Sequence, residues 1–233
     1  MLRKQKPESY HFKPLYQSYF RENWFKKIDN YLKVRFPPIV NRLIDTFRYV
    51  DFHPINKGTY SYEFTSLLRD IGGAISSVLD SFILGVWGPP KNKYQRKKEY
   101  NMGDYRDFLL DEISNLEKVV VILNVNFDEK YLIPFKIIER NKKFNPVWWE
   151  AYNKVKHKDI HSLQMGCLSN VIYGFGALSI LVDSIITLDI RTGSSMTYES
   201  VFSLNRISIL TRNLIAYIGD VTSDVKIKEF PYV

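Results

Sequence analysis

The chain has 233 residues, of which 45% are hydrophobic and 15% aromatic, and its formal net charge is +8. This apolar content excludes a largely disordered chain. Since one hydrophobic core serves up to roughly 250 residues, a single domain over residues 1–233 is expected. The one cysteine, Cys167, excludes an internal disulfide and a cysteine-rich zinc site. The positive charge favours an anionic partner such as nucleic acid.

Helical periodicity dominates the first third of the chain. Residues 15–50 are predicted to form one or two helices, divided at Pro37 and Pro38, which then occupy the first turn of the second helix. Helical spacing returns after a loop in eight apolar residues: Phe64, Leu67, Leu68, Ile71, Ile75, Val78, Leu79 and Phe82. Gly72 and Gly73 lie inside this helix and cost about 1 kcal/mol each relative to alanine. They predict that another element packs closely there, or that the helix kinks.

The middle of the chain mixes a loop, a helix and short strands. Residues 87–101 contain prolines and many charges without periodicity, which predicts a basic loop. Apolar residues at helical spacing then predict a helix from Tyr105 to Leu116. A short β-branched run and the segment YLIPF predict a small β-hairpin over residues 119–136, in which Pro134 confines its strand to an edge.

The second half is again predicted to be helical. Asn145 and Pro146 are a capping residue and a first-turn proline, so they predict a helix start. Helices are expected over residues 146 to about 158, about 163 to 188, and 197–218. The first two are separated by a possible break at residues 159–162. The tail, residues 222–233, is expected to be extended or disordered.

Residues 162–182 carry no charge and have the length of a membrane-spanning helix. Polar residues such as Asn170, and Asp183 directly after the stretch, favour a helix enclosed by other helices instead. No secretory signal is visible near Met1. A cytoplasmic protein without a membrane partner is therefore expected.

The stretch NPVWWEAYNKVKHKD, residues 145–159, and the apolar helix after it resemble the later half of HEPN-like proteins. In that family a Trp-rich segment and a Tyr-Asn-x-x-Lys-His-x-Arg motif precede a helix that packs into a bundle. The matching residues of this chain are Trp148, Trp149, Tyr152, Asn153, Lys156 and His157. Residues 59–83 also resemble an earlier bundle helix of such proteins.

The resemblance implies a mainly all-α fold, a HEPN-like helical bundle carrying the small hairpin as an insertion. It implies RNA as a partner and, for the active members, metal-independent endoribonuclease activity in bacterial stress or defence. Two features depart from the pattern. Asp159 stands where an arginine is usual. The positions where active HEPN ribonucleases carry an arginine before the histidine hold Glu150, Ala151 and Tyr152.

The residues themselves allow a site on the helix that starts at Pro146. Asn153 and Lys156 or His157 share one helical face. Neighbouring lysines favour the neutral imidazole of His157, which suits a general base, while Lys156 and Lys158 hold a phosphate. The candidate catalytic residues are therefore His157, Asn153 and Lys156, and RNA would supply its own 2′-hydroxyl as nucleophile. In the alternative, Asn153 and His157 bond neighbouring helices and the lysines are solvated.

The basic loop is the second candidate for nucleic-acid contact, because its cations hold phosphates while its tyrosines stack on bases. The candidate nucleic-acid-binding residues are Lys93, Tyr94, Arg96, Lys97, Lys98, Lys154 and Lys158. The alternative is a solvated loop without a ligand.

Other chemistries are weakly indicated. His157 and His161 are four residues apart, which is a possible metal pair, but no His-Glu-x-x-His pattern is present, and no metal or other cofactor is expected. A second functional class stays open: a non-catalytic interaction protein whose bundle forms a homodimer or binds a protein partner.

Overall fold

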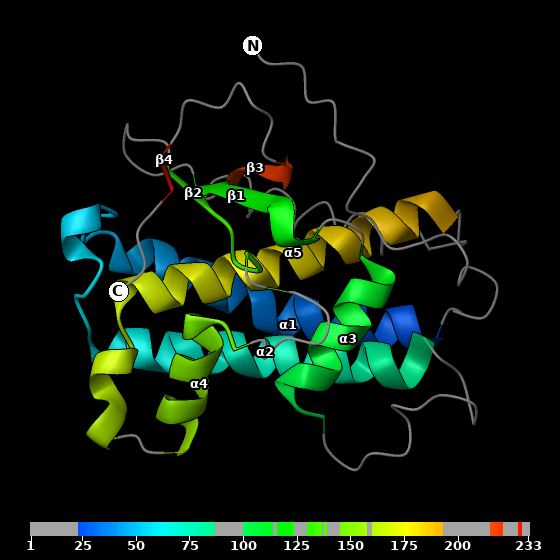
Figure 1. Cartoon of the computed structure of the whole chain (residues 1–233), viewed down its shortest axis with the longest axis horizontal. Helices are drawn as coiled ribbons and strands as arrows, with labels where there is room; N and C mark the ends of the chain where they lie inside the picture. The colour runs from blue at the N-terminus through cyan, green and yellow to red at the C-terminus, as the bar shows by residue number, and fades with distance from the viewer. Residues whose placement is uncertain are drawn as a thin grey trace.

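The computed structural model describes residues 23–86, 100–113, 116–123, 130–136, 138, 145–157, 160–192, 215–220 and 228–229. The described part is mainly helical, which confirms the predicted class. Its helices lie together on one side and short strands lie on the other (Figure 1).

Helix α1 spans Asn23–Thr46 and passes through Pro37 and Pro38 without ending. The predicted division at these prolines is therefore wrong. A proline cannot donate to the carbonyl four residues earlier, which here is that of Lys33 or Val34. The Val34 side chain is 69% exposed, so this turn faces water. Burial of Phe36, Ile39 and Val40 on the other side then outweighs the lost helical bonds.

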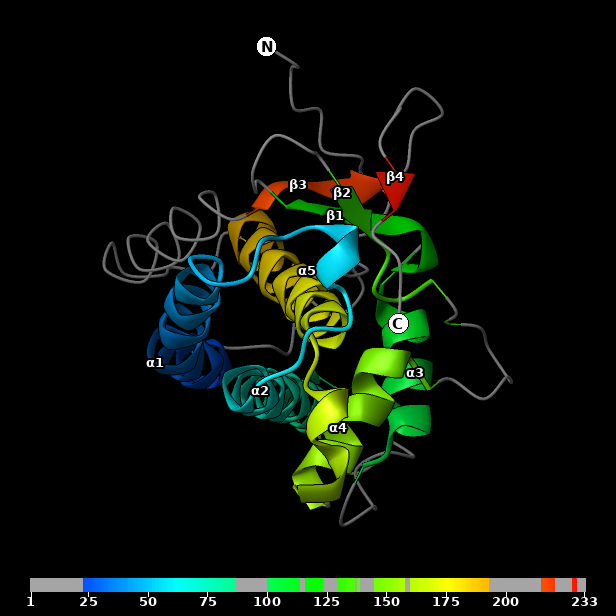
Figure 2. The ribbon, with the colours of Figure 1, turned by 90° about the vertical axis from the view of Figure 1, so that its left-hand side faces the viewer.

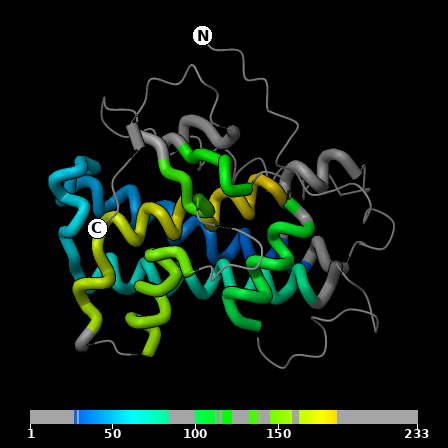
Figure 3. Tube along the Cα trace, viewed as in Figure 1, coloured from blue at the N-terminus to red at the C-terminus, as the bar shows by residue number. Residues whose placement is uncertain are grey.

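Helix α2 spans Tyr62–Val86 and begins where Ser61 caps it, since the Ser61 hydroxyl accepts from the Phe64 amide at 3.0 Å. The predicted helix is confirmed. It packs against α1, against α4, which spans Val147–His157, and against α5, which spans Leu168–Thr192. Seen end-on, α5 lies between α2 and the sheet (Figure 2). The tube of Figure 3 shows α1, α2 and α5 running lengthwise together.

Residues 166–182 are buried, as expected for an enclosed helix, whereas Leu163, Gln164 and Met165 keep some exposure. Within the described part of the chain, no helix combines the length and apolar character needed to cross a membrane.

Two shorter helices cover one side of α2. Helix α3 spans Met102–Glu112 and starts with a capping box, in which Asn101 and Asp104 each bond the other's backbone amide. Helix α4 spans Val147–His157. The 3₁₀ helices are η2 Pro54–Asn56, η3 Leu116–Lys118 and η4 Ile160–Met165. The chain thus leaves α-helical geometry between α4 and α5, near the predicted break.

Four strands form a sheet in the order β3-β1-β2-β4: β1 Val119–Leu123, β2 Lys130–Leu132, β3 Ile215–Asp220 and β4 Lys228–Glu229. The β1 and β2 strands pair antiparallel where the sequence predicts a hairpin, and β3 pairs antiparallel with β1. The predicted helix over 197–218 is wrong for residues 215–218, because these pair with the open edge of β1. Residues 197–214 lie outside the described residues.

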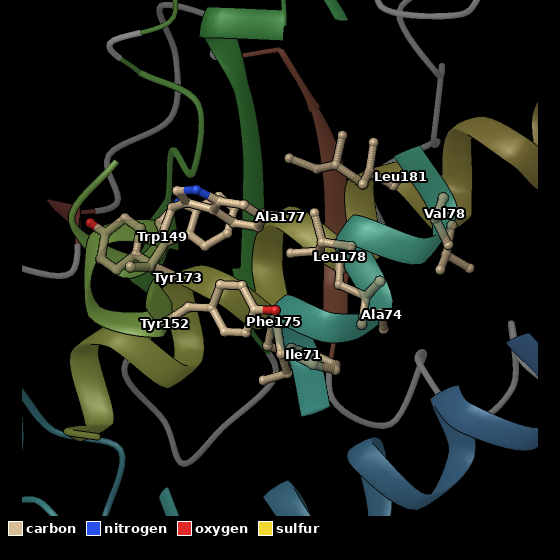
Figure 4. Close-up of a cluster of buried hydrophobic side chains, with 14 of the residues drawn as sticks. Ile71, Ala74, Val78, Trp149, Tyr152, Tyr173, Phe175, Ala177, Leu178 and Leu181 are labelled. Carbon is tan, nitrogen blue, oxygen red and sulfur yellow. The ribbon is translucent and has the colours of Figure 1, made fainter. Parts of the chain in front are cut away.

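Buried side chains from all five α-helices and from β1 and β2 form one connected hydrophobic cluster. Figure 4 shows part of this cluster, to which α2 contributes Ile71, α4 contributes Tyr152 and α5 contributes Leu178. Gly176 of α5 brings the sheet close, since a Cβ there would lie 3.0 Å from the Pro134 ring. The helical layer and the sheet therefore share one core.

Candidate functional site

The apolar face of α4 is held by aromatic contacts. The Trp148 indole donates to the Pro134 carbonyl at 3.0 Å and is fully buried. Trp149 packs edge-on against both Trp148 and Tyr105 of α3, with ring centroids 5.7 and 5.8 Å apart. Tyr152 adjoins Trp149 at 5.0 Å. Four aromatic rings from two helices therefore fix the orientation of α4.

At Gly72 a side chain of α4 lies directly against the backbone of α2. A Cβ added at Gly72 would lie 2.3 Å from the Tyr152 ring, whereas one at Gly73 would meet nothing within 4 Å. The predicted close packing is thus confirmed at Gly72. The partner is Tyr152, one of the residues that carry the resemblance to HEPN-like proteins.

The C-terminal end of α4 is capped by a cation from α2. The Arg69 guanidinium donates through Nε and Nη2 to the Val155 carbonyl, at 3.1 and 3.0 Å. The last carbonyls of a helix lack partners within that helix, so a cation there is stabilising. Arg69 therefore fixes the backbone two residues before His157.

The three candidate catalytic residues occupy this end of α4. Lys156 and His157 are exposed, and Asn153 is partly exposed. Neither the Asn153 nor the His157 side chain is hydrogen-bonded to a described residue, so within the described chain neither side chain acts as a bridge between helices. The Lys156 ammonium lies 5.6 Å from the centroid of the Tyr152 ring. The His157 imidazole and the Lys156 ammonium are therefore exposed to solvent on a helix whose backbone Arg69 holds in place.

The candidate nucleic-acid-binding residues are only partly described. Lys154 is about half exposed and pairs with Glu150 at 2.8 Å, an i,i+4 contact that water and salt screen. The remaining candidates, Lys93, Tyr94, Arg96, Lys97, Lys98 and Lys158, lie outside the described residues.

A cluster of polar residues that includes Lys156 was not predicted from the sequence. It comprises Ser76 and Asp80 of α2, Tyr100, Tyr105 of α3 and Lys156 of α4, and we call it the Asp80 cluster. The Tyr105 hydroxyl donates to Asp80 Oδ1 at 2.7 Å. Burial and this bond raise the pKa of Tyr105, and the neighbouring Ser76 hydroxyl opposes the shift. The cluster therefore joins polar groups from three helices.

Asp80 is partly buried, and burial raises the pKa of its carboxyl above the ordinary value. The Tyr105 bond and the charge of Lys156 act in the opposite direction and are weaker. Lys156 thus lies close enough to act on Asp80, although the two form no direct ion pair. Gly72, Ser76 and Asp80 follow one another at four-residue intervals, which places them on one face of α2.

The described residues offer neither a metal-binding site nor a reactive thiol. No group of three or more histidine, cysteine, aspartate or glutamate residues within the described ranges is arranged to hold a metal ion. Cys167 is buried, and burial raises the pKa of its thiol, which disfavours the reactive thiolate.

Comparison with known proteins found no matching family model, no similar curated protein and no similar solved structure. The fold and the exposed end of α4 therefore define this chain only as a mainly helical protein with a small sheet.

Proposed function

We propose that this protein is a HEPN-like helical bundle that binds RNA through the exposed end of α4. One observation carries the proposal: Lys156 and His157 are exposed at the end of a helix that Arg69, Gly72 and Tyr152 hold in place. A fixed cation beside an imidazole suits a phosphodiester, because phosphate contacts supply much of the affinity for nucleic acid. The residues matching the HEPN motif and the charge of +8 support the same partner.

Cleavage is the catalytic extension of this proposal. His157 would take the proton from an RNA 2′-hydroxyl, and the 2′-oxygen would form a bond to phosphorus while the bond to the 5′-oxygen breaks. The leaving 5′-oxygen would take a proton from water or from the imidazolium that His157 has become, which leaves a 2′,3′-cyclic phosphate and a 5′-hydroxyl. The arginine of active HEPN ribonucleases has no counterpart at Glu150, Ala151 or Tyr152. Arg69 is engaged with the Val155 carbonyl. Binding is therefore the primary proposal.

Binding is tested with a fluorescent single-stranded RNA titrated over a range of salt concentrations. Lys156→Gln should weaken binding and lower the salt slope by about 1, the value for one lost phosphate contact. The control is Lys118→Gln, which removes the same charge from an exposed position in η3. Equal effects of the two changes would show only non-specific attraction, and no binding at low salt would overturn the proposal.

Cleavage is tested with the same RNA and His157→Ala. Loss of a general base should reduce the rate roughly a hundredfold or more, while a chelator should leave the wild-type rate unchanged. An equal rate in the variant would remove His157 from the reaction. A wild-type protein that binds RNA without cutting it would remove the catalytic extension alone.

A second candidate function is association with another protein or a second copy. Six large hydrophobic side chains are exposed among the described residues, and four of them lie in the connection between α1 and α2 or at the first residue of α2: Tyr49, Ile55, Tyr60 and Tyr62. This segment lies at one end of the molecule (Figure 1). Sedimentation at increasing concentration tests it, and a dimer that dissociates on Ile55→Ser would favour this candidate.

A further inference from the structure

The chain around the exposed end of α4 is attached to α2 at two points that lie one helical turn apart. At the first point, the Arg69 guanidinium donates to the Val155 carbonyl at 3.1 and 3.0 Å. At the second, Thr65 adjoins Gly166 so closely that a Cβ on Gly166 would lie 2.6 Å from the Thr65 Cα. Thr65 and Arg69 are four residues apart, so they share one face of α2. The chain therefore leaves this face at Val155 and returns to it at Gly166.

Backbone hydrogen bonds also hold the second point. The Ser61 amide donates to the Gly166 carbonyl at 3.3 Å, and the Leu168 amide donates to the Thr59 carbonyl at 2.9 Å. This attachment does not involve a charged group. Arg69 is thus the cation at these two points, and it lies at the one nearer to the proposed RNA-binding residues.

The C-terminal end of a helix is an unfavourable place for a phosphate. The last four carbonyls of a helix have no amide partner within it, and the aligned peptide dipoles give this end a charge of roughly −0.5. The Val155 carbonyl is one of these four, because α4 ends at His157. A phosphate that approaches Lys156 and His157 therefore also meets the negative end of α4. Binding at this end needs a cation that offsets the dipole.

Arg69 supplies such a cation. In a continuing helix the Val155 carbonyl would accept from the amide four residues later, and the Arg69 guanidinium takes the place of that amide. An amide is neutral, whereas a guanidinium carries a full positive charge, which outweighs the partial charge of the helix end. Lys154, another cation of the last turn, pairs with Glu150 at 2.8 Å. The charge of Arg69 is therefore placed where the dipole would otherwise repel an anion.

We propose that Arg69 is a positioning residue of the RNA-binding end of α4, where its charge offsets the helix dipole and lets a phosphate reach Lys156 and His157. This inference rests on the proposed RNA binding and adds a residue from a second helix to it. Arg69 acts through the Val155 carbonyl and need not touch RNA. A purely structural cap would act through its hydrogen bonds alone, whereas in this role the RNA affinity follows the charge at position 69.

Two substitutions separate charge from hydrogen bonding in a titration with fluorescent single-stranded RNA. Arg69→Gln keeps an amide donor but removes the charge, so it should weaken binding roughly three- to tenfold at low salt, and less at high salt. Arg69→Lys keeps the charge but gives up the two-nitrogen contact, so it should retain the wild-type affinity within about twofold. Arg48→Gln is the control, because it removes the same charge from a position that is 73% exposed. It should change the affinity less than Arg69→Gln does.

A second measurement uses wild-type protein and inorganic phosphate, so it stands even if a variant fails to fold. Phosphate titrated into the protein should shift the NMR signals of the Lys156 and His157 amides together with the Arg69 Nε–H signal. In folded Arg69→Gln the two amide shifts should be lost or reduced. Shifts of the two amides without any change at Arg69 would overturn its role.

The outcomes separate this inference from the proposed function. Equal RNA affinity of wild type and Arg69→Gln, or equal weakening in Arg69→Gln and Arg69→Lys, overturns the role of the Arg69 charge and leaves the RNA proposal intact. Phosphate shifts that depend on Arg69, in a protein that binds no RNA, support the role of the charge and overturn the RNA proposal. Binding of neither RNA nor phosphate overturns both.

Discussion

Two neighbouring glycines show how much a single residue position can differ from the next. Gly72 and Gly73 look alike in the sequence, and each should weaken a helix to a similar degree. In the structure Gly72 faces the Tyr152 ring, and Gly73 has open space beside it. The cost of a glycine in α2 is therefore offset by helix packing at one position only.

The pair of changes Gly72→Ala and Gly73→Ala tests this difference. Gly73→Ala should raise the free energy of unfolding by up to about 1 kcal/mol, because alanine favours the helix and has room. Gly72→Ala should lower it by about 1 to 3 kcal/mol, because the new methyl group forces Tyr152 and α4 away. Urea unfolding of both variants gives the measurement. Equal effects would contradict the close contact.

At the scale of elements, α4 depends on its neighbours for its position. It has eleven residues, a length at which isolated helices are marginal in water. Aromatic packing holds one face and Arg69 caps the end that carries His157. The geometry of the candidate site is therefore a property of α2 and α3 as much as of α4.

Arg69→Gln tests the cap. Loss of a charged donor from the Val155 carbonyl should lower the free energy of unfolding by about 1 to 3 kcal/mol. Amide hydrogen exchange should also speed up in the last turn of α4, since that turn loses its partner. Arg48→Gln is the matched control, because Arg48 is 73% exposed and pairs only locally with Asp45. Unchanged exchange in α4 would show that Arg69 does not hold this end.

At the scale of the whole molecule, the sheet joins parts of the chain that are far apart in sequence. Strand β3, residues 215–220, pairs with β1 in the middle of the chain. The sheet then packs on α5, and Trp148 of α4 bonds the Pro134 carbonyl just after β2. One buried hydrogen bond thus links the helical layer to the sheet.

Trp148→Phe should weaken this link. It leaves the buried Pro134 carbonyl without its partner, which should cost about 1 to 3 kcal/mol in addition to the smaller ring. Trp149→Phe is the control, since the Trp149 indole nitrogen donates to no described residue while its ring is nearly as buried. Chemical denaturation should therefore show a larger loss for Trp148→Phe, and equal losses would contradict the role of the bond.

The sequence by itself determined the helical class, the position of α2, the existence of a helix near α3, the enclosed character of α5 and a strand pair near residues 119–132. These follow from apolar periodicity and end signals, which are local properties. It failed at Pro37 and Pro38, where burial of α1 outweighed the lost backbone bonds, and at residues 215–218, where a distant strand supplied the pairing.

The candidate site was likewise predicted only in part from the sequence. His157, Lys156 and Asn153 were visible from their spacing along one helix, and the structure places two of them in solvent. Asp80 and Tyr105 come from segments that the sequence cannot bring together, so their hydrogen bond and shifted pKa values were decided only by tertiary packing. The physical reason is that desolvation and hydrogen bonding act over a few ångströms in space, whatever the separation along the chain.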